Sequence, residues 1–276
     1  LTMFHINKAQ DHEAFVEALE HFTGPPQNFI FGSKDGTIAM HLPGKFPIKR
    51  PGLGKFLLDG SDPDSEAKSF IPFEHRLKIV NPKRQFLSSA NQHPVDSLYP
   101  YYVYDHHYEY DRNRRINDRL KILSKVTPED MKKLQNDNFN YRAYEILPVM
   151  LDTLDTTSFK AREWKYYNML ESWDYFNEPE LIAPTVFQMW WNILYKNIWD
   201  EFDTISVAID KPGHYNTVKL LQSNPGFKLF DILETPSKED AIALYNMTFR
   251  MAVDSLTGMQ EQGEDLRWYI FKNTCY

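Results

Sequence analysis

The sequence contains one cysteine, Cys275, among 276 residues, which excludes an intrachain disulfide framework and a cysteine-based zinc site. It also lacks an excess of basic residues, with 31 Lys and Arg against 38 Asp and Glu and a net charge of −7. A protein that binds nucleic acid or an anionic membrane would carry a basic stripe, so neither partner is expected. The most apolar stretch, 181–199, is interrupted by polar residues and by Pro184, and therefore predicts a core helix rather than a membrane span.

The signatures of several large enzyme classes are missing too. The sequence has no Gly-x-Gly-x-x-Gly, no Walker lysine motif and no Gly-x-Ser-x-Gly elbow, which argues against nucleotide-binding and α/β-hydrolase folds. Hydrophobic residues are plentiful at 42%, with 15% aromatic, so a sizeable core is expected. Both ends of the chain look internal: it begins at Leu1, and 268–271 is an apolar aromatic run that predicts a strand or buried segment. We therefore expect a piece of a longer protein.

Two halves differ in composition. In the first, residues 1–110, Asp11 is a good N-cap for a helix that Gly24 and two prolines end. Asp35-Gly36 between two β-prone runs predicts a hairpin, 28–32 with 37–41. Residues 42–74, rich in proline and glycine, predict a long surface excursion, and 86–90 predicts a short strand.

The second half, residues 111–276, predicts a mostly helical subdomain. A helix is expected from Asp111, and Thr127 followed by Pro128 and Asp130 forms a strong helix start. The expected helices that follow are 127–134, 141–154, 161–176, 181–202, 215–221 and 238–257. The fold class predicted from these patterns is α+β.

Three groups of residues invite a chemical interpretation, and each has a plainer one. His106-His107 suggests a metal or acid–base site, but adjacent residues seldom point at one ion, so a polar loop is favoured. The acids of 59–66 superficially resemble a calcium loop, yet the EF-hand pattern is broken, which favours a solvated acidic loop. Trp190-Trp191 would suit a stacking platform, but their helical spacing favours the core.

Five ordered segments resemble the penicillin acylase (penicillin amidase) family. They are Gln27 to Ile38, His41-Leu42-Pro43-Gly44-Lys45-Phe46-Pro47, Phe70-Ile71-Pro72-Phe73-Glu74 with Val80-Asn81-Pro82, Ser88-Ser89-Ala90-Asn91-Gln92 with Tyr99-Pro100, and Arg112 to Ile116. The family consists of N-terminal nucleophile (Ntn) hydrolases, in which a precursor cleaves itself and a new N-terminal serine attacks an amide. The resemblance implies that residues 1–110 supply part of the Ntn-hydrolase layered sheet and that the chain is an internal fragment of the large (beta) chain.

The resemblance also implies two catalytic residues. Asn91 matches the family asparagine that donates to the oxyanion of the tetrahedral intermediate, although an asparagine there would also suit a turn. Arg112 matches a family arginine near the catalytic centre, although an arginine at a helix start would otherwise be assigned to the surface. Two departures stand out: Gln92 replaces a second asparagine, and no Gly-Ser-Asn cleavage site is present.

From these matches we expect the parent protein to be an exported amide hydrolase, periplasmic or extracellular, and the isolated chain to be inactive. The substrate class is a linear amide, either of the penicillin side chain or of the acyl-homoserine lactone type. No cofactor is expected for catalysis, and a structural calcium is expected only in the full-length protein, where Asp105 is the one local candidate ligand. The expected partners are the small-molecule amide and the remaining segments of the parent acylase. The alternatives are a non-catalytic helical binding or scaffold module on an acylase framework and, less favoured, an aromatic-rich glycan-binding domain.

Overall fold

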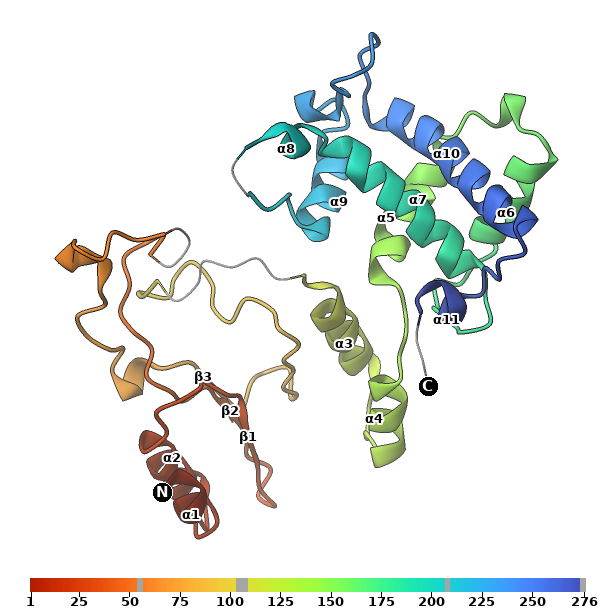
Figure 1. Ribbon diagram of the computed structural model, residues 1–276. Coiled ribbons are helices and arrows are strands. Elements are labelled where there is room, and N and C mark those ends of the chain that lie inside the picture. The colour runs from red at the N-terminus through yellow and green to blue at the C-terminus, as the bar shows by residue number, and fades with distance from the viewer. Residues whose placement is uncertain (54–56, 103–108, 207–208, 274–276) are drawn as a thin grey trace. The chain divides into compact units, whose positions relative to one another are not determined.

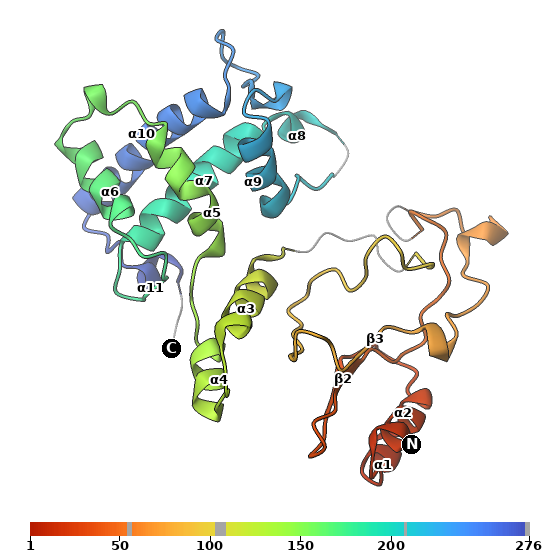
Figure 2. The ribbon, with the colours of Figure 1, turned by 180° about the vertical axis from the view of Figure 1, so that it is seen from behind.

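The computed structural model describes residues 1–53, 57–102, 109–206 and 209–273. These residues form two compact units, Leu1–Ser124 and Lys125–Tyr276 (Figures 1 and 2). The first unit combines helices with a small sheet, and the second has helices but no assigned strand among its described residues, so the chain is α+β. The division lies beyond residue 110 because helix α3 (Asp111–Ile122) is hydrogen-bonded to the segment before it, through Arg84 and Asn117 among others.

The first unit is built around an antiparallel sheet of order β1-β2-β3, with β1 at Phe29–Gly32, β2 at Ile38–His41 and β3 at Lys78–Val80. A short helix α1 (Thr2–Ile6) precedes helix α2 (His12–Glu20), which packs on one face of the sheet. The contact is aromatic: the Phe15 ring of α2 lies 5.2 Å from that of Phe31, centroid to centroid. The predicted α2 cap is confirmed, because Asp11 accepts a hydrogen bond from the backbone N–H of Ala14.

The predicted hairpin is also confirmed. β1 pairs with β2 so that Gly32 faces Ile38 and Phe29 faces His41. In the connecting turn the Asp35 carboxylate accepts from the backbone N–H of Thr37 at 2.9 Å. Gly36 has φ +92°, a conformation that residues with a Cβ rarely adopt. Local chemistry alone therefore specifies this hairpin.

The predicted surface excursion after β2 has little regular structure before β3. It contains two short 3₁₀ turns, Pro63–Ser65 and Phe73–His75. Two backbone hydrogen bonds close its base, from Ile48 N–H to the Ser69 carbonyl and from Ile71 N–H to the Phe46 carbonyl. The side chain of Ile71 is fully buried, and this anchors the segment that returns toward the sheet. The chain then enters β3, which the sequence patterns did not predict.

The second unit packs its helices around α7. Its elements are α4 (Pro128–Gln135), α5 (Tyr141–Asp152), a 3₁₀ turn (Thr156–Ser158), α6 (Ala161–Glu171), α7 (Ala183–Ile198), α8 (Glu201–Thr204), α9 (His214–Ser223), a 3₁₀ turn (Lys228–Phe230), α10 (Ala241–Glu261) and α11 (Trp268–Phe271). Helices α7 and α10 form the most extensive pair. Both Trp190 and Trp191 are fully buried, and the Trp190 indole N–H donates to the hydroxyl of Thr248 in α10. The tryptophan pair thus belongs to the core, as its spacing predicted.

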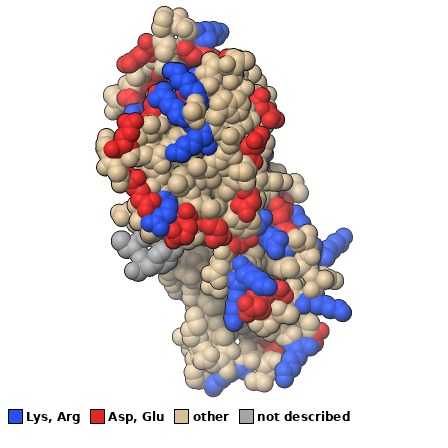
Figure 3. Space-filling view, turned by 90° about the vertical axis from the view of Figure 1, so that its right-hand side faces the viewer, with Lys and Arg blue, Asp and Glu red and all other residues tan. Residues whose placement is uncertain are grey.

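Two expectations for the second unit were wrong. The aromatic run 268–271 is the short helix α11, neither a strand nor buried, and its first N–H groups bond to the carbonyls of Leu181 and Pro179. Helix α6 ends at Glu171 rather than at Phe176, because the chain reverses there and the Trp173 indole donates to the Phe176 carbonyl. None of the helices in the described ranges combines the length and the apolar character that crossing a membrane requires. Figure 3 shows acidic and basic side chains interspersed with other residues on one face.

Candidate functional site

Of the two residues singled out by the sequence, Asn91 lies on a segment that begins where β3 ends, and Arg112 lies in helix α3. Asn81 terminates β3 with φ +45°, and its side chain accepts a hydrogen bond from the backbone N–H of Ile38 at 3.0 Å. A tight turn follows, closed by the bond from Gln85 N–H to the Pro82 carbonyl. The segment that leads to Asn91 is therefore anchored to the hairpin at its start.

Residues 86–90 were expected to form a short strand, but the structure shows none there. This stretch is held by side chains instead of a backbone ladder. The Asn28 amide donates to the Ser89 hydroxyl at 2.8 Å, and the Ser88 hydroxyl donates to the side-chain oxygen Oδ1 of Asn117 at 3.3 Å. This stretch is thus hydrogen-bonded to Asn28, just before β1, and to Asn117 of helix α3.

Asn91 lies in a tight turn with a left-handed backbone, φ +58°. Asparagine tolerates this conformation better than most residues. The Gln92 side chain, which departs from the family pattern, accepts a hydrogen bond from the backbone N–H of Ala90 at 2.7 Å and so closes the turn. Gln92 therefore has a structural use in the turn that displays Asn91.

Arg112 contacts Asn91 directly. It lies in the first turn of α3, and its Nη2 donates to Asn91 Oδ1 at 2.6 Å, with a longer contact of 3.5 Å to the Ala90 carbonyl. A charge-assisted hydrogen bond of this length is among the stronger ones in proteins. Because Oδ1 faces the guanidinium, Nδ2 of the same amide is directed away from it, and it has no acceptor among the described residues. The structure thus brings the two predicted residues together, with the arginine setting the orientation of the amide.

A network that sequence reasoning missed ties this turn to α3. Asn117 is its hub: Oδ1 accepts from Arg84 Nη1 at 2.9 Å as well as from Ser88, and Nδ2 donates to the backbone carbonyl of Asn113. The Arg84 guanidinium also donates through Nε to the Phe86 carbonyl. These residues are separated by up to 33 positions, and no local pattern signals that they meet.

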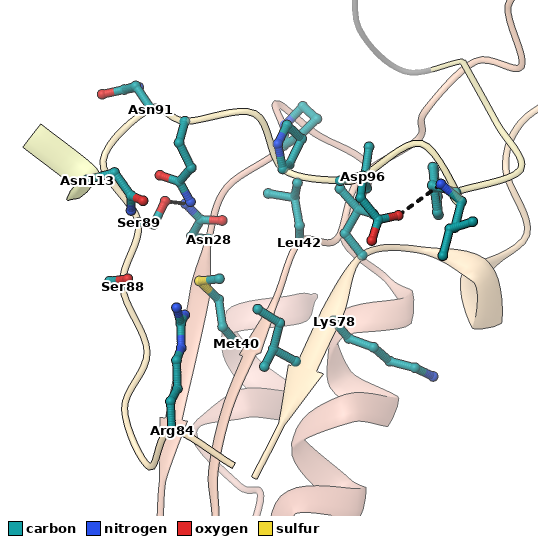
Figure 4. Close-up of a pocket in the computed structure, with 18 of the residues that line it drawn as sticks. Asn28, Met40, Leu42, Lys78, Arg84, Ser88, Ser89, Asn91, Asp96 and Asn113 are labelled. Carbon is teal, nitrogen blue, oxygen red and sulfur yellow. Dashed lines mark hydrogen bonds between the residues drawn. The ribbon is translucent and has the colours of Figure 1, made fainter. Parts of the chain in front are cut away.

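A cavity of about 870 Å³ lies beside this segment, over the sheet face opposite α2. Its floor includes Met40 of β2 and Ile79 of β3, and its polar lining includes Asn28, Arg84 and Ser88 (Figure 4). Asn91 is at the outer edge of the cavity, where its side chain points away from Met40 (Figure 4). The Asn91 side chain is exposed, so another group can reach its amide.

The other candidates do not form a site. Among the residues that the structure describes, no three His, Cys, Asp or Glu side chains are placed to hold a metal ion. Asp105, His106, His107 and Cys275 lie outside the described residues. The acids of 59–66 are exposed and make local bonds: Ser61 donates to Asp59 and lowers the pKa of that carboxyl, and Lys68 pairs with Asp64 at 2.7 Å. The solvated-loop interpretation holds for them.

Comparisons with known proteins agree with the resemblance seen in the sequence. The family model described as penicillin amidase matches residues 1–274. Among solved structures, the chain is similar to a thermostable penicillin G acylase from Alcaligenes faecalis, with a TM-score of 0.66 and 14% sequence identity. The match covers 97% of this chain and 52% of that chain, so the sequence spans about half the length of that acylase chain. At this identity the structural likeness establishes a shared fold.

Proposed function

Because the chain belongs to the penicillin amidase family of amide hydrolases, we propose that it supplies the oxyanion-binding part of an acylase that cleaves a linear amide. The observation that carries this proposal is the 2.6 Å hydrogen bond from Arg112 to Asn91 Oδ1. It holds Oδ1 of the amide against the guanidinium and leaves the Nδ2 hydrogens without an acceptor among the described residues. Such preoriented donors are what a developing oxyanion requires.

In the proposed reaction the nucleophile is an N-terminal serine that lies outside this sequence. Its hydroxyl attacks the amide carbonyl carbon, and the serine's own α-amino group, with an ordinary pKa of about 7.7–8.0, takes the hydroxyl proton. The carbonyl oxygen becomes an oxyanion that accepts a hydrogen bond from Asn91 Nδ2. The amine then leaves with the proton, and water hydrolyses the acyl-enzyme. Arg112 acts as a positioning residue, since it contacts Asn91 and not the reacting atoms.

Several finer statements belong to this proposal. The substrate is a linear amide of the penicillin side-chain or acyl-homoserine lactone type, and the protein is periplasmic or extracellular, as in the family. Segments of the parent protein outside this chain complete the acyl pocket and hold the structural calcium. No cofactor takes part in the reaction. The isolated chain is inactive because it has no Gly-Ser-Asn junction from which the nucleophile could arise.

The experiment begins with the full-length parent protein, whose intact mass and new chain ends are determined after expression. Two chains, the larger starting at serine, are expected. A single uncleaved chain without serine at the junction would instead support the alternative, a non-catalytic helical binding or scaffold module. Hydrolysis of a linear amide by the isolated 276-residue chain would contradict the assignment of the nucleophile to another segment.

The role of Asn91 is then tested by two substitutions that separate the side chain from the backbone. Asn91→Gly removes the amide at no cost to the left-handed backbone, whereas Asn91→Ala also introduces strain of about 1 kcal/mol. Both are expected to lower kcat by about 10²–10³. The matched control is Lys125→Gly, at another exposed residue with positive φ and outside the segment that carries Asn91, which is expected to leave kcat intact. Retention of kcat within threefold in Asn91→Gly would overturn the oxyanion role.

A further inference from the structure

A second, much smaller cavity of about 20 Å³ lies on the other side of β2, between α2, the β2–β3 pair and the turn at 73–75. We call it the Arg76 cavity. Its polar lining consists of His41, Arg76 and Lys78, and its remaining walls are apolar, among them Leu19 and Phe73. A space of this size accommodates about one water-sized occupant. No carboxylate lines it.

The Arg76 guanidinium gives this cavity a chemical character. Its Nε and Nη1 are buried and have no hydrogen-bond partner within the described part of the chain. The guanidinium carbon lies 5.0 Å from the centroid of the Phe73 ring, so the aromatic side chain covers one face of the charged group. Buried donors without an acceptor are rare in native proteins and normally indicate a bound water or ion.

The charges around the cavity favour an anion over water. Lys78 of β3 pairs in register with His41 of β2, and His12 of α2 approaches His41 with the two Nε2 atoms 3.0 Å apart. Glu20 and Glu74 raise the pKa of Arg76, opposing the larger effect of burial, but neither accepts a hydrogen bond from Nε or Nη1. The lining therefore includes the Arg76 guanidinium and the exposed Lys78, and it contains no carboxylate.

We propose that the Arg76 cavity binds one small monovalent anion of the size of chloride, with Arg76 Nε and Nη1 as its donors. The Phe73 ring and the apolar walls lie beside the guanidinium, and a less polar surrounding strengthens its attraction to an anion. The site is independent of the proposed amide hydrolysis, although Leu42, Leu77 and Lys78 also line the larger cavity beside Asn91. A bound anion would therefore fix part of the floor of that larger cavity.

The test is chloride NMR on the full 276-residue chain. Exchange with a protein site broadens the ³⁵Cl resonance, and addition of bromide or nitrate should displace chloride and narrow it again, whereas gluconate should not. Arg76→Met is expected to abolish the broadening. The control is Arg162→Met, which removes an arginine that is 45% exposed and paired with Asp254. Broadening that is absent, or equal in the wild type and Arg76→Met, would overturn the proposal and identify the occupant as water.

Amide hydrogen exchange in β2 gives a second measurement at constant sodium concentration. At a chloride concentration ten times Kd, protection should rise about elevenfold over that in gluconate. Arg76→Met should remove this difference, while general salt effects should remain in both proteins. Should Arg76→Met fail to fold, the bromide competition and the exchange difference in the wild type decide the question alone. Equal protection of wild-type β2 in chloride and gluconate would contradict anion binding.

Discussion

Lowering the pH should reduce the stability of the first unit because of His41. This side chain is only 6% exposed, and burial, with smaller contributions from the charges of His12 and Lys78, lowers its pKa from 6.5 to about 4. Arg76 lines the same cavity as His41. The groups that face His41 from α2, β3 and the turn at 73–75 are therefore apolar or basic, and none is a carboxylate that could stabilise an imidazolium.

The sign and size of the change in stability follow from the difference in the pKa of His41 between the folded and unfolded states. The unfolded chain takes up a proton near pH 6.5, while the folded chain does so only near pH 4, so between these values the unfolded state binds more protons. The contribution of His41 to the free energy of unfolding has its full value above pH 6.5 and is lost as the pH falls to 4. At 1.36 kcal/mol per pKa unit, the loss in the free energy of unfolding is about 3 kcal/mol.

The distribution of tryptophan dictates the assay. All six tryptophans belong to the second unit, so their fluorescence reports on that unit and not on the sheet. The stability of the first unit is better followed by amide hydrogen exchange in β2 between pH 7 and 4, after correction for the intrinsic exchange rate. Replacement His41→Asn should flatten the pH dependence, because the titrating group is gone. Replacement His21→Asn, at the exposed end of α2, should leave it unchanged.

The difference between the wild type and His41→Asn is the decisive quantity, since exposed carboxylates titrate equally in both. If the two proteins lose protection in parallel from pH 6.5 to 4, burial of His41 does not control the acid stability of this unit. If tryptophan fluorescence detects the same loss at the same pH, the effect extends to the second unit and does not arise from His41 alone.

Three other substitutions have defined outcomes. Leu147→Ala should destabilise the second unit by about 2–5 kcal/mol, since Leu147 is fully buried, and urea unfolding followed by tryptophan fluorescence measures this. Asn140→Ala should cost only about 1 kcal/mol in the same assay, because it removes the cap that accepts from Ala143 N–H; a loss equal to that of Leu147→Ala would refute the assignment as a cap. Asn117→Ala should speed amide exchange at residues 84–92 roughly thirtyfold, since it removes two hydrogen bonds to this segment worth about 1 kcal/mol each; unchanged exchange would show that the hub is dispensable.

Elements defined by neighbouring residues were predictable from the sequence. The Asp11 cap, the Asp35-Gly36 hairpin and the Thr127 capping box all depend on contacts within a few positions, and the structure shows each of them. Strand β3 is different, because it has three residues and exists only through pairing with β2, almost 40 positions earlier. A periodic pattern needs more residues than this strand contains, so it was missed.

The candidate site divides in the same way. Asn91 and Arg112 were named from family segments, and the structure adds the contact between them and its direction. Residues 86–90 were expected to form a strand because their composition suits one, but the hydrogen bonds come from Asn28 and Asn117, which composition does not reveal. Non-local side-chain hydrogen bonds are thus the part of this site that a single sequence conceals.

The closed base of the long excursion has a consequence for engineering. The backbone bond from Ile48 to Ser69 and the burial of Ile71 hold its two ends, so the rest of the framework does not depend on the length between them. Doubling such a loop costs only about 0.6 kcal/mol of closure entropy. A peptide tag or a small binding module inserted near Ser61, which is exposed, should therefore be tolerated without disturbing the turn that carries Asn91. The same small cost applies to natural insertions, so we expect relatives of this chain to differ most in length within this excursion.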